Sequence, residues 1–459
     1  TGNFSGVDFS LKGIGENLSE DFGFTADLSL DHASTVELIR KFSPEYFPAK
    51  TALGAFSLDA TITGSEGRTS LDNLTFQLGP AAFQGNLMFA DRGGRSFIGG
   101  ELTVRNLTMD DFMAPTAAGL EEAVNEGGPR WSRDQWDVDF LQETDFDVRL
   151  GADSLTFRTY RFLNPKVRLI GRGGVLTIEN LIADIFDGTM TLNATMDATM
   201  NSSDVPILEG TLDLTGVSTE AALKASADIT NLTGTLSLVG SFRGVGNSQE
   251  EVISTLSGSA VVSSEDGLIK GINMPRLSEQ MATLDTLSAF SRVLGAVLEG
   301  GQTPYRYIRT EAIIAAGIIS FDAVDADVDA TEMAAHGRID LPGWDMDITG
   351  AIRLKDQEEV PAIGVSMKGR VDEPEVNYDY IALTAFMTKR FTSNLFQQLL
   401  NIQTEEEGGA VLPEGEGAAS EEEAGPTPEQ EIIKGLFDLF GGDEEEAEEE
   451  PVEEDEGGG

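Results

Sequence analysis

The chain has 459 residues, enough for two to four domains, and its 40% hydrophobic residues allow a sizeable folded body. The formal net charge of −48 argues against nucleic-acid binding, which needs a basic surface to displace counterions, and against direct attraction of the whole chain to an anionic membrane. The absence of cysteine excludes disulfides, zinc sites built on thiolates and thiol catalysis.

A short β pattern recurs along most of the chain, in which a glycine at a turn is followed by a strand of alternating apolar and polar residues. This two-residue period is typical of a strand with one dry and one wet face. Repetition over hundreds of residues predicts an elongated β architecture and favours carrying or bridging over catalysis. The tripeptide Asn-Leu-Thr also recurs, and we expect Asn73, Asn106 and Asn231 at turns or strand edges. The β pattern is clearest in 85–89, 99–104, 188–192, 210–214 and 234–238.

The amino-terminal part of the chain is predicted to be mainly β, with one short helix. Ser34 or Thr35 could cap this helix, and Pro44 stops it. The other segments are, in chain order, strands over 1–31 and 53–104 and an irregular stretch over 110–136 that holds a short helix near 120–124.

The strongest helical pattern in the chain covers residues 275–298. Its large apolar residues recur every three or four positions and form an amphipathic stripe, which we expect to pack over the apolar face of the carboxy-terminal strands. The stripe consists of Leu277, Met281, Leu284, Leu287, Phe290, Leu294 and Leu298. The elements around it are a β block over 137–200, short helices near 218–225 and 249–256, strands over 307–378 and a last helix over about 380–400.

Beyond Asn401 the composition changes to Glu, Gly, Ala and Pro. Residues 404–459 contain 22 acidic residues and one basic residue, Lys434, so this tail is predicted to be disordered. An apolar island over 429–440 is predicted to form a helix only when it docks on a protein surface, because the acidic residues around it repel anionic lipid. An idle, solubilising tail is the alternative.

Sequence motifs for catalysis are missing, and we expect a protein that is not an enzyme and has no cofactor. The two histidines, His32 and His336, are isolated in the sequence. The acidic run 325–329 is the strongest metal candidate, since calcium prefers clusters of carboxylate oxygens. Alternating aspartates on the wet face of a strand explain the run better, so no metal site is expected.

Several motifs, in order and spacing, resemble the AsmA-like family of bacterial envelope proteins over about residues 30–400. The resemblance is strongest after Leu256, where Asp266-Gly267-Leu268-Ile269-Lys270-Gly271 resembles the hallmark turn of the family. Two features depart from the family, namely the missing amino-terminal membrane helix and the strong charge of the tail. The other matching segments are 131–132, 145–153, 176–181, 186–189, 316–319, 336–341 and 365–369.

The resemblance implies a protein anchored in the bacterial inner membrane by an amino-terminal helix absent from this sequence, with its bulk in the periplasm. The implied fold is mainly β with a few short helices: an elongated, curled antiparallel sheet with an open apolar face, a β-groove. The expected organisation is a repeating β-groove region over 1–255, an AsmA-like carboxy-terminal domain over 256–403 and the acidic tail over 404–459.

The function implied by the resemblance is non-enzymatic binding or conduction of phospholipid along the groove between the inner and outer membranes, in support of outer-membrane biogenesis. An amphipathic sheet must cover its apolar face with a second sheet, helices or ligand, and helices are few here. The alternative is a scaffold or regulator of outer-membrane protein assembly and targeting. Expected partners are phospholipid, the membrane and an envelope or outer-membrane protein at the far end. The candidate lipid-groove residues are Phe83, Leu87, Phe89, Leu102, Val104, Met190, Leu192, Leu212, Leu214, Leu236 and Leu238.

Overall fold

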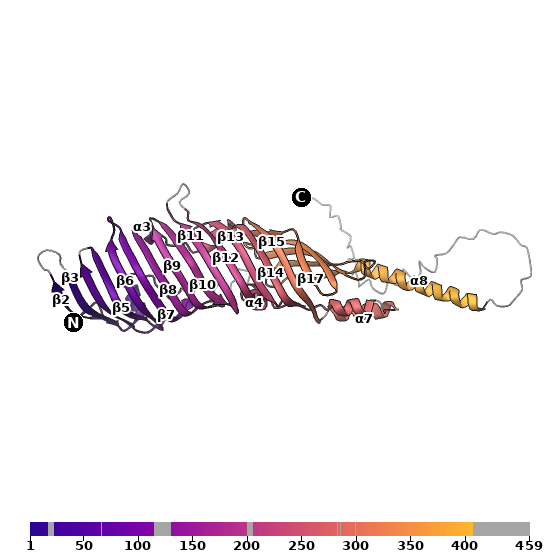
Figure 1. Ribbon diagram of the computed structural model, residues 1–459, viewed down its shortest axis with the longest axis horizontal. Coiled ribbons are helices and arrows are strands. Elements are labelled where there is room, and N and C mark those ends of the chain that lie inside the picture. The colour runs from indigo at the N-terminus through magenta and orange to yellow at the C-terminus, as the bar shows by residue number, and fades with distance from the viewer. Residues whose placement is uncertain are drawn as a thin grey trace, which may run out of the picture. The chain divides into compact units, whose positions relative to one another are not determined.

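The computed structural model describes residues 1–16, 23–65, 67–113, 130–199, 205–281, 283–284, 286–298 and 300–406. Residues 1–395 form one compact unit, whose described part is built on a single sheet of 21 strands (Figure 1). This confirms the predicted mainly β fold with one long curled sheet and few short helices. The predictions for residues 120–124 and for the tail beyond Glu406, including the helix over 429–440, lie outside the described residues.

In the amino-terminal part each strand pairs with the next one along the chain, so the strands follow one another across the sheet. The predicted helix cap is confirmed, because the Ser34 hydroxyl accepts a hydrogen bond of 3.2 Å from the amide of Glu37. The elements are β1 (Gly2–Phe4), β2 (Val7–Glu16), β3 (Gly23–His32), α1 (Thr35–Arg40), β4 (Phe56–Ser65), β5 (Arg68–Leu78), β6 (Ala81–Asp91), β7 (Ser96–Thr108) and the 3-10 turn η1 (Met109–Asp111).

The middle of the sheet contains one parallel pair, β7 with β8, whereas the other pairs are antiparallel. Ser96, the first residue of β7, lies opposite Thr144, the first residue of β8. A parallel pair requires a long crossover connection, and residues 109–143 supply it. The elements are α3 (Phe140–Glu143), β8 (Thr144–Phe157), β9 (Tyr160–Arg172), β10 (Val175–Ile185), β11 (Gly188–Asp197), β12 (Ile207–Ser218), α4 (Thr219–Ala227), β13 (Thr235–Val245) and α5 (Gln249–Ser254).

The carboxy-terminal strands continue the same sheet. β13 pairs with β14 without interruption across the predicted domain boundary at residue 255, so this boundary is not a break in the sheet. Strand β15 pairs with both β16 and β17, and both of these contact β18. The elements are β14 (Ser257–Lys270), α6 (Met274–Met281), α7 (Leu287–Leu298), β15 (Gln302–Ala315), β16 (Ile318–Phe321), β17 (Val324–Val328), β18 (Thr331–Asp340), β19 (Asp345–Leu354), β20 (Ile363–Arg370), β21 (Glu375–Asp379) and α8 (Ile381–Glu406).

The prediction of one long helix over 275–298 was wrong, because this segment forms two helices, α6 and α7. Two threonines near the break explain the error. The Thr283 amide and hydroxyl both bond the carbonyl of Gln280, which ends α6, and the Thr286 hydroxyl accepts from the amide of Ala289 at the start of α7. Threonine favours such local hydrogen bonds over a continued helix.

The largest hydrophobic core lies where α6, α7 and α8 cover β19 and β20. Leu277 and Met281 of α6 and Phe290 of α7 are almost completely buried there. Their strand partners include Ile352 and Ile363. The predicted packing of the apolar stripe over the carboxy-terminal strands is therefore confirmed, although Leu284 is only partly buried. No helix in the described part of the chain is long and apolar enough to cross a membrane.

A second contact brings the carboxy-terminal strands back onto the middle of the sheet. Trp344 and Met346, at the start of β19, pack with Ala227 at the end of α4 and with Trp131. Trp131 Nε1 donates a hydrogen bond of 2.8 Å to the carbonyl of Leu341. We call this contact the seam. It closes the curl of the sheet between α4 and the β18–β19 turn.

The helical core generates a stability prediction. The Leu277 side chain has no exposed surface, so Leu277→Ala should lower the free energy of unfolding by about 2–5 kcal/mol, because it leaves a cavity among three helices. Arg276→Ala on the exposed side of α6 is the matched control and should have little effect. Denaturant unfolding followed by circular dichroism measures both. Equal stability of the two variants would mean that α6 does not pack on the sheet.

Candidate functional site

Direct strand pairing places the predicted residues of the amino-terminal half on one face of the sheet. Phe83 lies opposite Phe76 and Val104, and the rings of Phe76 and Phe83 stack with centroids 4.6 Å apart. Leu87 lies opposite Leu71. Directly opposite residues share a face, so these side chains point to the same side. The remaining predicted residues of this half follow the same register in the pairs Phe89–Ile98 and Gly85–Leu102.

The predicted residues of the middle part share a face in the same way. Met190 on β11 lies opposite Leu214 on β12, which in turn lies opposite Leu238 on β13. Leucine therefore faces leucine or methionine across three consecutive strands. The other predicted residues here follow the same register in the pairs Leu192–Leu212 and Val217–Leu236.

Strands β7 to β11 join the two groups into one continuous face. Leu102 pairs with Leu150 on β8, and Leu150 lies opposite Val167 on β9. Further along β9, Leu169 lies opposite Ile178 on β10, and Ile178 lies opposite Ala194, two residues from Leu192. The strand register therefore brings all the predicted groove residues onto the same side, which we call the apolar face.

Bulges correct the alternation where the sequence breaks it. The register shifts between Leu71 and Leu74 on β5, and Asn73 inside this bulge has a φ of 51°. The same device occurs at Asn180 on β10 and Gly216 on β12, with φ of 49° and 68°. Asparagine and glycine tolerate this left-handed conformation, and the extra residue returns the next apolar side chain to the apolar face. Asn73 thus lies inside a strand, not at a turn or strand edge.

The side chains of the apolar face are only partly covered. Among the predicted residues, only Val104 and Met190 are buried, at 7% and 9% exposure, and Phe89 is 38% exposed. The others have intermediate exposure. In a β-sandwich the inward residues of both sheets pack together and are almost wholly buried. The face has apolar chemistry throughout, yet over much of its length no second layer of described residues covers it.

Helix α4 covers one part of the apolar face. It begins at Ser218, whose hydroxyl accepts from the amide of Ala221 at 3.3 Å, and Ala222 packs against a cluster around the fully buried Val217. The other members of this cluster include four predicted groove residues, Met190, Leu212, Leu214 and Leu236. These four therefore line a covered stretch, whereas Leu192 and Leu238 do not belong to the cluster.

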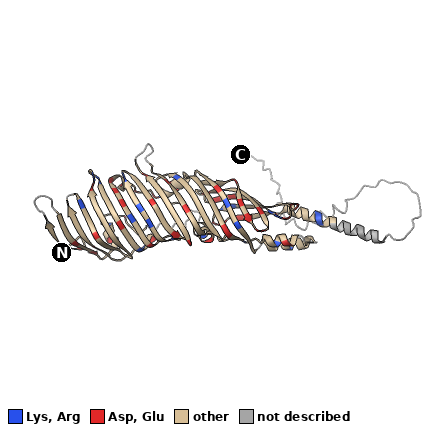
Figure 2. Ribbon diagram, in the orientation of Figure 1, with Lys and Arg blue, Asp and Glu red and all other residues tan. Residues whose placement is uncertain are grey.

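The opposite face of the sheet is polar and carries ion pairs between neighbouring strands, and Figure 2 shows acidic and basic residues spread along the strands. Arg168 on β9 reaches Asp147 at 2.7 Å and Glu179 at 2.9 Å. Glu209 and Arg243 lie directly opposite each other, 2.9 Å apart. The hydrogen bond from Arg168 holds the pKa of Asp147 below its ordinary value. This face is suited to contact with water.

The acidic run 325–329 also belongs to this ion-pair pattern. Asp327 lies 2.6 Å from Arg306 and 2.9 Å from Lys355, and the hydrogen bond from Lys355 lowers the pKa of its carboxyl. The described residues contain no group of three or more His, Asp or Glu side chains that could hold a metal ion. Two cations therefore already satisfy the central aspartate of the run.

At the amino-terminal edge the apolar face is widely exposed. Phe4 is 78% exposed and Leu11 is 51% exposed, and with Phe9 they continue the face onto β1 and β2. A depression of about 670 Å³ lies here, lined by Phe4, Val7, Phe9 and Leu30 among others. The candidate residues chosen from the sequence omitted this edge, although the alternation Val7, Phe9, Leu11 is the signal that could have found it.

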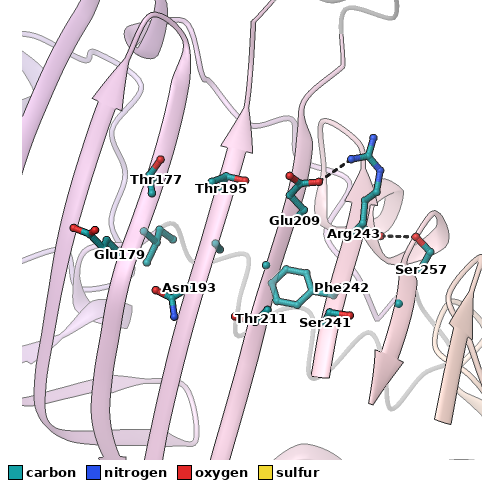
Figure 3. A pocket seen from close by; sticks show the side chains of 14 residues that line it. Thr177, Glu179, Asn193, Thr195, Glu209, Thr211, Ser241, Phe242, Arg243 and Ser257 are labelled. Atoms are coloured by element: carbon teal, nitrogen blue, oxygen red, sulfur yellow. Dashed lines mark hydrogen bonds and ion pairs between the residues drawn. The ribbon is translucent and has the colours of Figure 1, made fainter. Parts of the chain in front are cut away.

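A second open depression, of about 650 Å³, crosses β10 to β14 (Figure 3). Its lining combines three small residues in the register of the apolar face, Ala194, Gly210 and Gly258, with side chains of the polar-face register such as Thr195 and Thr211. Figure 3 shows the ion pair of Glu209 with Arg243 beside it.

The ion pairs of the polar face generate a prediction on pH dependence. The pKa of Asp147 is lower in the folded state than in the unfolded state. The ion pair with Arg168 therefore stabilises the fold fully at pH values above the unfolded-state pKa, and this stabilisation is lost as the pH falls through the folded-state pKa. Arg168→Gln should therefore lower the melting temperature slightly at neutral pH and leave it unchanged in strong acid. Thermal unfolding at both pH values tests this, and an equal loss at both would assign Arg168 a packing role.

Comparison with known proteins gave one finding. The model of the AsmA family matches residues 35–324, which is more than half of the chain. The match includes β4 to β15, and with them all the predicted groove residues. No curated protein and no solved structure matched the chain.

Proposed function

The chain belongs to the AsmA family of envelope-associated proteins, as the sequence motifs predicted, and from this premise we propose that it binds and conducts phospholipid without catalysing a reaction. In this proposal the acyl chains lie on the apolar face of the sheet, and the polar face remains in water. The proposed location is the periplasm, between the inner and outer membranes, which the family resemblance implies. The family's amino-terminal membrane helix would anchor it.

The observation that carries the proposal is a continuous apolar face that is only partly covered. An exposed apolar surface of this extent marks a binding site, because water covers it at a cost in free energy. Among the described helices, α6, α7 and α8 cover the carboxy-terminal strands and α4 covers a stretch of the middle. Hydrocarbon is the ligand that matches a surface made of Leu, Phe, Val, Ile and Met, with no charged side chain among the predicted groove residues.

The dimensions of strand and bilayer are compatible. Neighbouring strands lie about 4.8 Å apart, and one leaflet of a bilayer contributes about 15 Å of hydrocarbon. An acyl chain running across the strands would therefore contact roughly three or four of them. The many strands of the apolar face offer room for a lipid to move without leaving apolar contact.

The energetics suit conduction better than tight storage. Burial of each CH₂ from water contributes about 0.8 kcal/mol. A lipid that enters from a bilayer loses nearly the same amount, because bilayer and groove are both apolar. The free energy along the face is then nearly level, which allows movement in either direction.

Photo-crosslinking tests the proposal directly. A benzophenone amino acid at Leu192, on the apolar face of β11, should capture phospholipid in the cell envelope, and the same residue at neighbouring Thr191, on the polar face, should not. Leu87 and Asn86 on β6 form an equivalent pair. Mass spectrometry of the crosslinked product identifies the adduct.

The outcome distinguishes an apolar face that binds lipid from one that contacts only protein. Lipid adducts at Leu192 and Leu87 but not at their polar neighbours would support the proposal. Adducts to protein alone at both apolar positions, with native mass spectrometry of the purified chain free of lipid, would overturn it.

The exposed edge of β2 favours a second candidate function, assistance to outer-membrane protein assembly. From Ser10 onward β2 pairs only with β3 among the described residues, so its other side could add a strand from a client. Leu11→Pro would remove a backbone donor on that side, because Val7 bonds β1 and every second residue after it points its amide away from β3. A defect in outer-membrane protein assembly with unchanged lipid crosslinking would favour this function over conduction.

A further inference from the structure

A cluster of arginines lies at the seam, in a chain with 79 acidic and only 31 basic residues. The guanidinium carbon of Arg130 lies 3.4 Å from the ring centroid of Trp344, in cation–π geometry. The same guanidinium donates a hydrogen bond of 3.2 Å to the carbonyl of Ser226 at the end of α4. Arg130 is thus held between the middle of the sheet and the start of β19.

Two further arginines come from other elements. Arg158 belongs to the turn between β8 and β9, and Arg370 ends β20. Burial lowers the pKa of the Arg130 guanidinium, and repulsion from Arg370 and Arg158 lowers it further, against the attraction of Asp372 and Tyr160. Hydrogen bonds of neighbouring residues place both near Arg130. Thr159 Oγ1 donates to the carbonyl of Ala225, next to Ser226, and the amide of Val371 donates to the carbonyl of Trp344.

Acidic groups at the cluster, Asp372, Glu373 and Asp345, attract Arg370. Asp372 accepts two hydrogen bonds from Arg370, at 3.1 and 2.8 Å. Arg130 and Arg158 form no ion pair among the described residues, although other basic residues of the sheet do. An arginine without an ion-pair partner is free to bind an anion.

Burial and exposure at the cluster also point to a ligand. Trp344 Nε1 is buried and has no hydrogen-bond partner among the described residues, which is unusual for a buried donor. Arg158 is exposed, and the Arg370 side chain is 42% exposed, so the cluster is open to solvent on one side. An anion can reach it without unfolding the seam.

The cluster adjoins the apolar face. Tyr160, close enough to Arg130 to affect its charge, packs against the hydrophobic cluster around Val217. Trp131 and Trp344 form an edge-to-face pair with ring centroids 5.9 Å apart and belong to the seam. A ligand with a charged head at the arginines would therefore have its apolar part beside strands β9 to β12.

We propose that Arg130, Arg158 and Arg370 form a site for the phosphate of an anionic phospholipid headgroup, at the point where the open apolar face meets the seam. The planar guanidinium matches phosphate oxygens with paired hydrogen bonds. The inference rests on the proposed lipid-binding function and adds a fixed headgroup position to it. A lipid halted there would have its acyl chains on the apolar face.

Tryptophan fluorescence offers the test, since two of the three tryptophans lie in the seam. The intact chain is titrated with water-soluble dihexanoyl-phosphatidylglycerol, with dihexanoylglycerol, which lacks the phosphate, and with inorganic phosphate. Arg130→Gln and Arg158→Gln are compared with Arg161→Gln, a matched control on an exposed residue of β9 that pairs with Thr156. Circular dichroism checks the fold, and Arg158→Gln keeps the test valid if Arg130→Gln loosens the seam.

The expected result is binding of the phosphatidylglycerol that weakens about tenfold in Arg158→Gln, as for loss of one charge-assisted hydrogen bond, and is unchanged in Arg161→Gln. Dihexanoylglycerol should bind the parent and Arg158→Gln equally. Phosphatidylglycerol binding that is the same in all variants would overturn the headgroup site and leave the proposed function standing. If inorganic phosphate bound through the arginines and neither lipid bound, the site would be one for free phosphate. That result would overturn both the lipid headgroup as its ligand and the proposed function.

Discussion

The structure depends on strand register, which keeps every second side chain on the same face from β2 to β20. Because the side-chain period of a strand is two, a slip of one residue would turn a strand's apolar side chains into water. The bulges at Asn73, Asn180 and Gly216 show how the chain keeps this register where apolar residues are three positions apart. Each inserts one residue and restores the apolar face.

A sheet that is apolar on one side must bury that side, and this chain does so only in part. Helices α6, α7 and α8 complete a core at the carboxy-terminal strands, and α4 covers a stretch of the middle. The remaining face keeps side chains of intermediate exposure, such as Leu87 and Leu192. The seam lies between the strands that helices cover and the strands whose apolar face stays partly exposed. Trp344 and Ala227 join these two parts of the sheet there.

Local signals in the sequence predicted the fold and the apolar face well. The alternation in segments such as 188–192 predicted β11, and Ser34 predicted a helix start, because these features act between near neighbours. The parallel pair β7–β8 and the bond from Trp131 to Leu341, 210 residues apart, escaped prediction, since no local pattern encodes such contacts. The arginine cluster escaped for the same reason, as its members are far apart in the sequence.

The most direct test of an open, lipid-accessible face uses the absence of cysteine in the chain. Single cysteines placed in turn from Met190 to Met196 on β11, each labelled with a polarity-sensitive fluorophore, report the loss of water when phospholipid vesicles are added. The account predicts a blue shift that alternates with the strand, present at Leu192, Ala194 and Met196 and absent at Thr191, Asn193 and Thr195. No shift at any position, or the same shift at all of them, would contradict it.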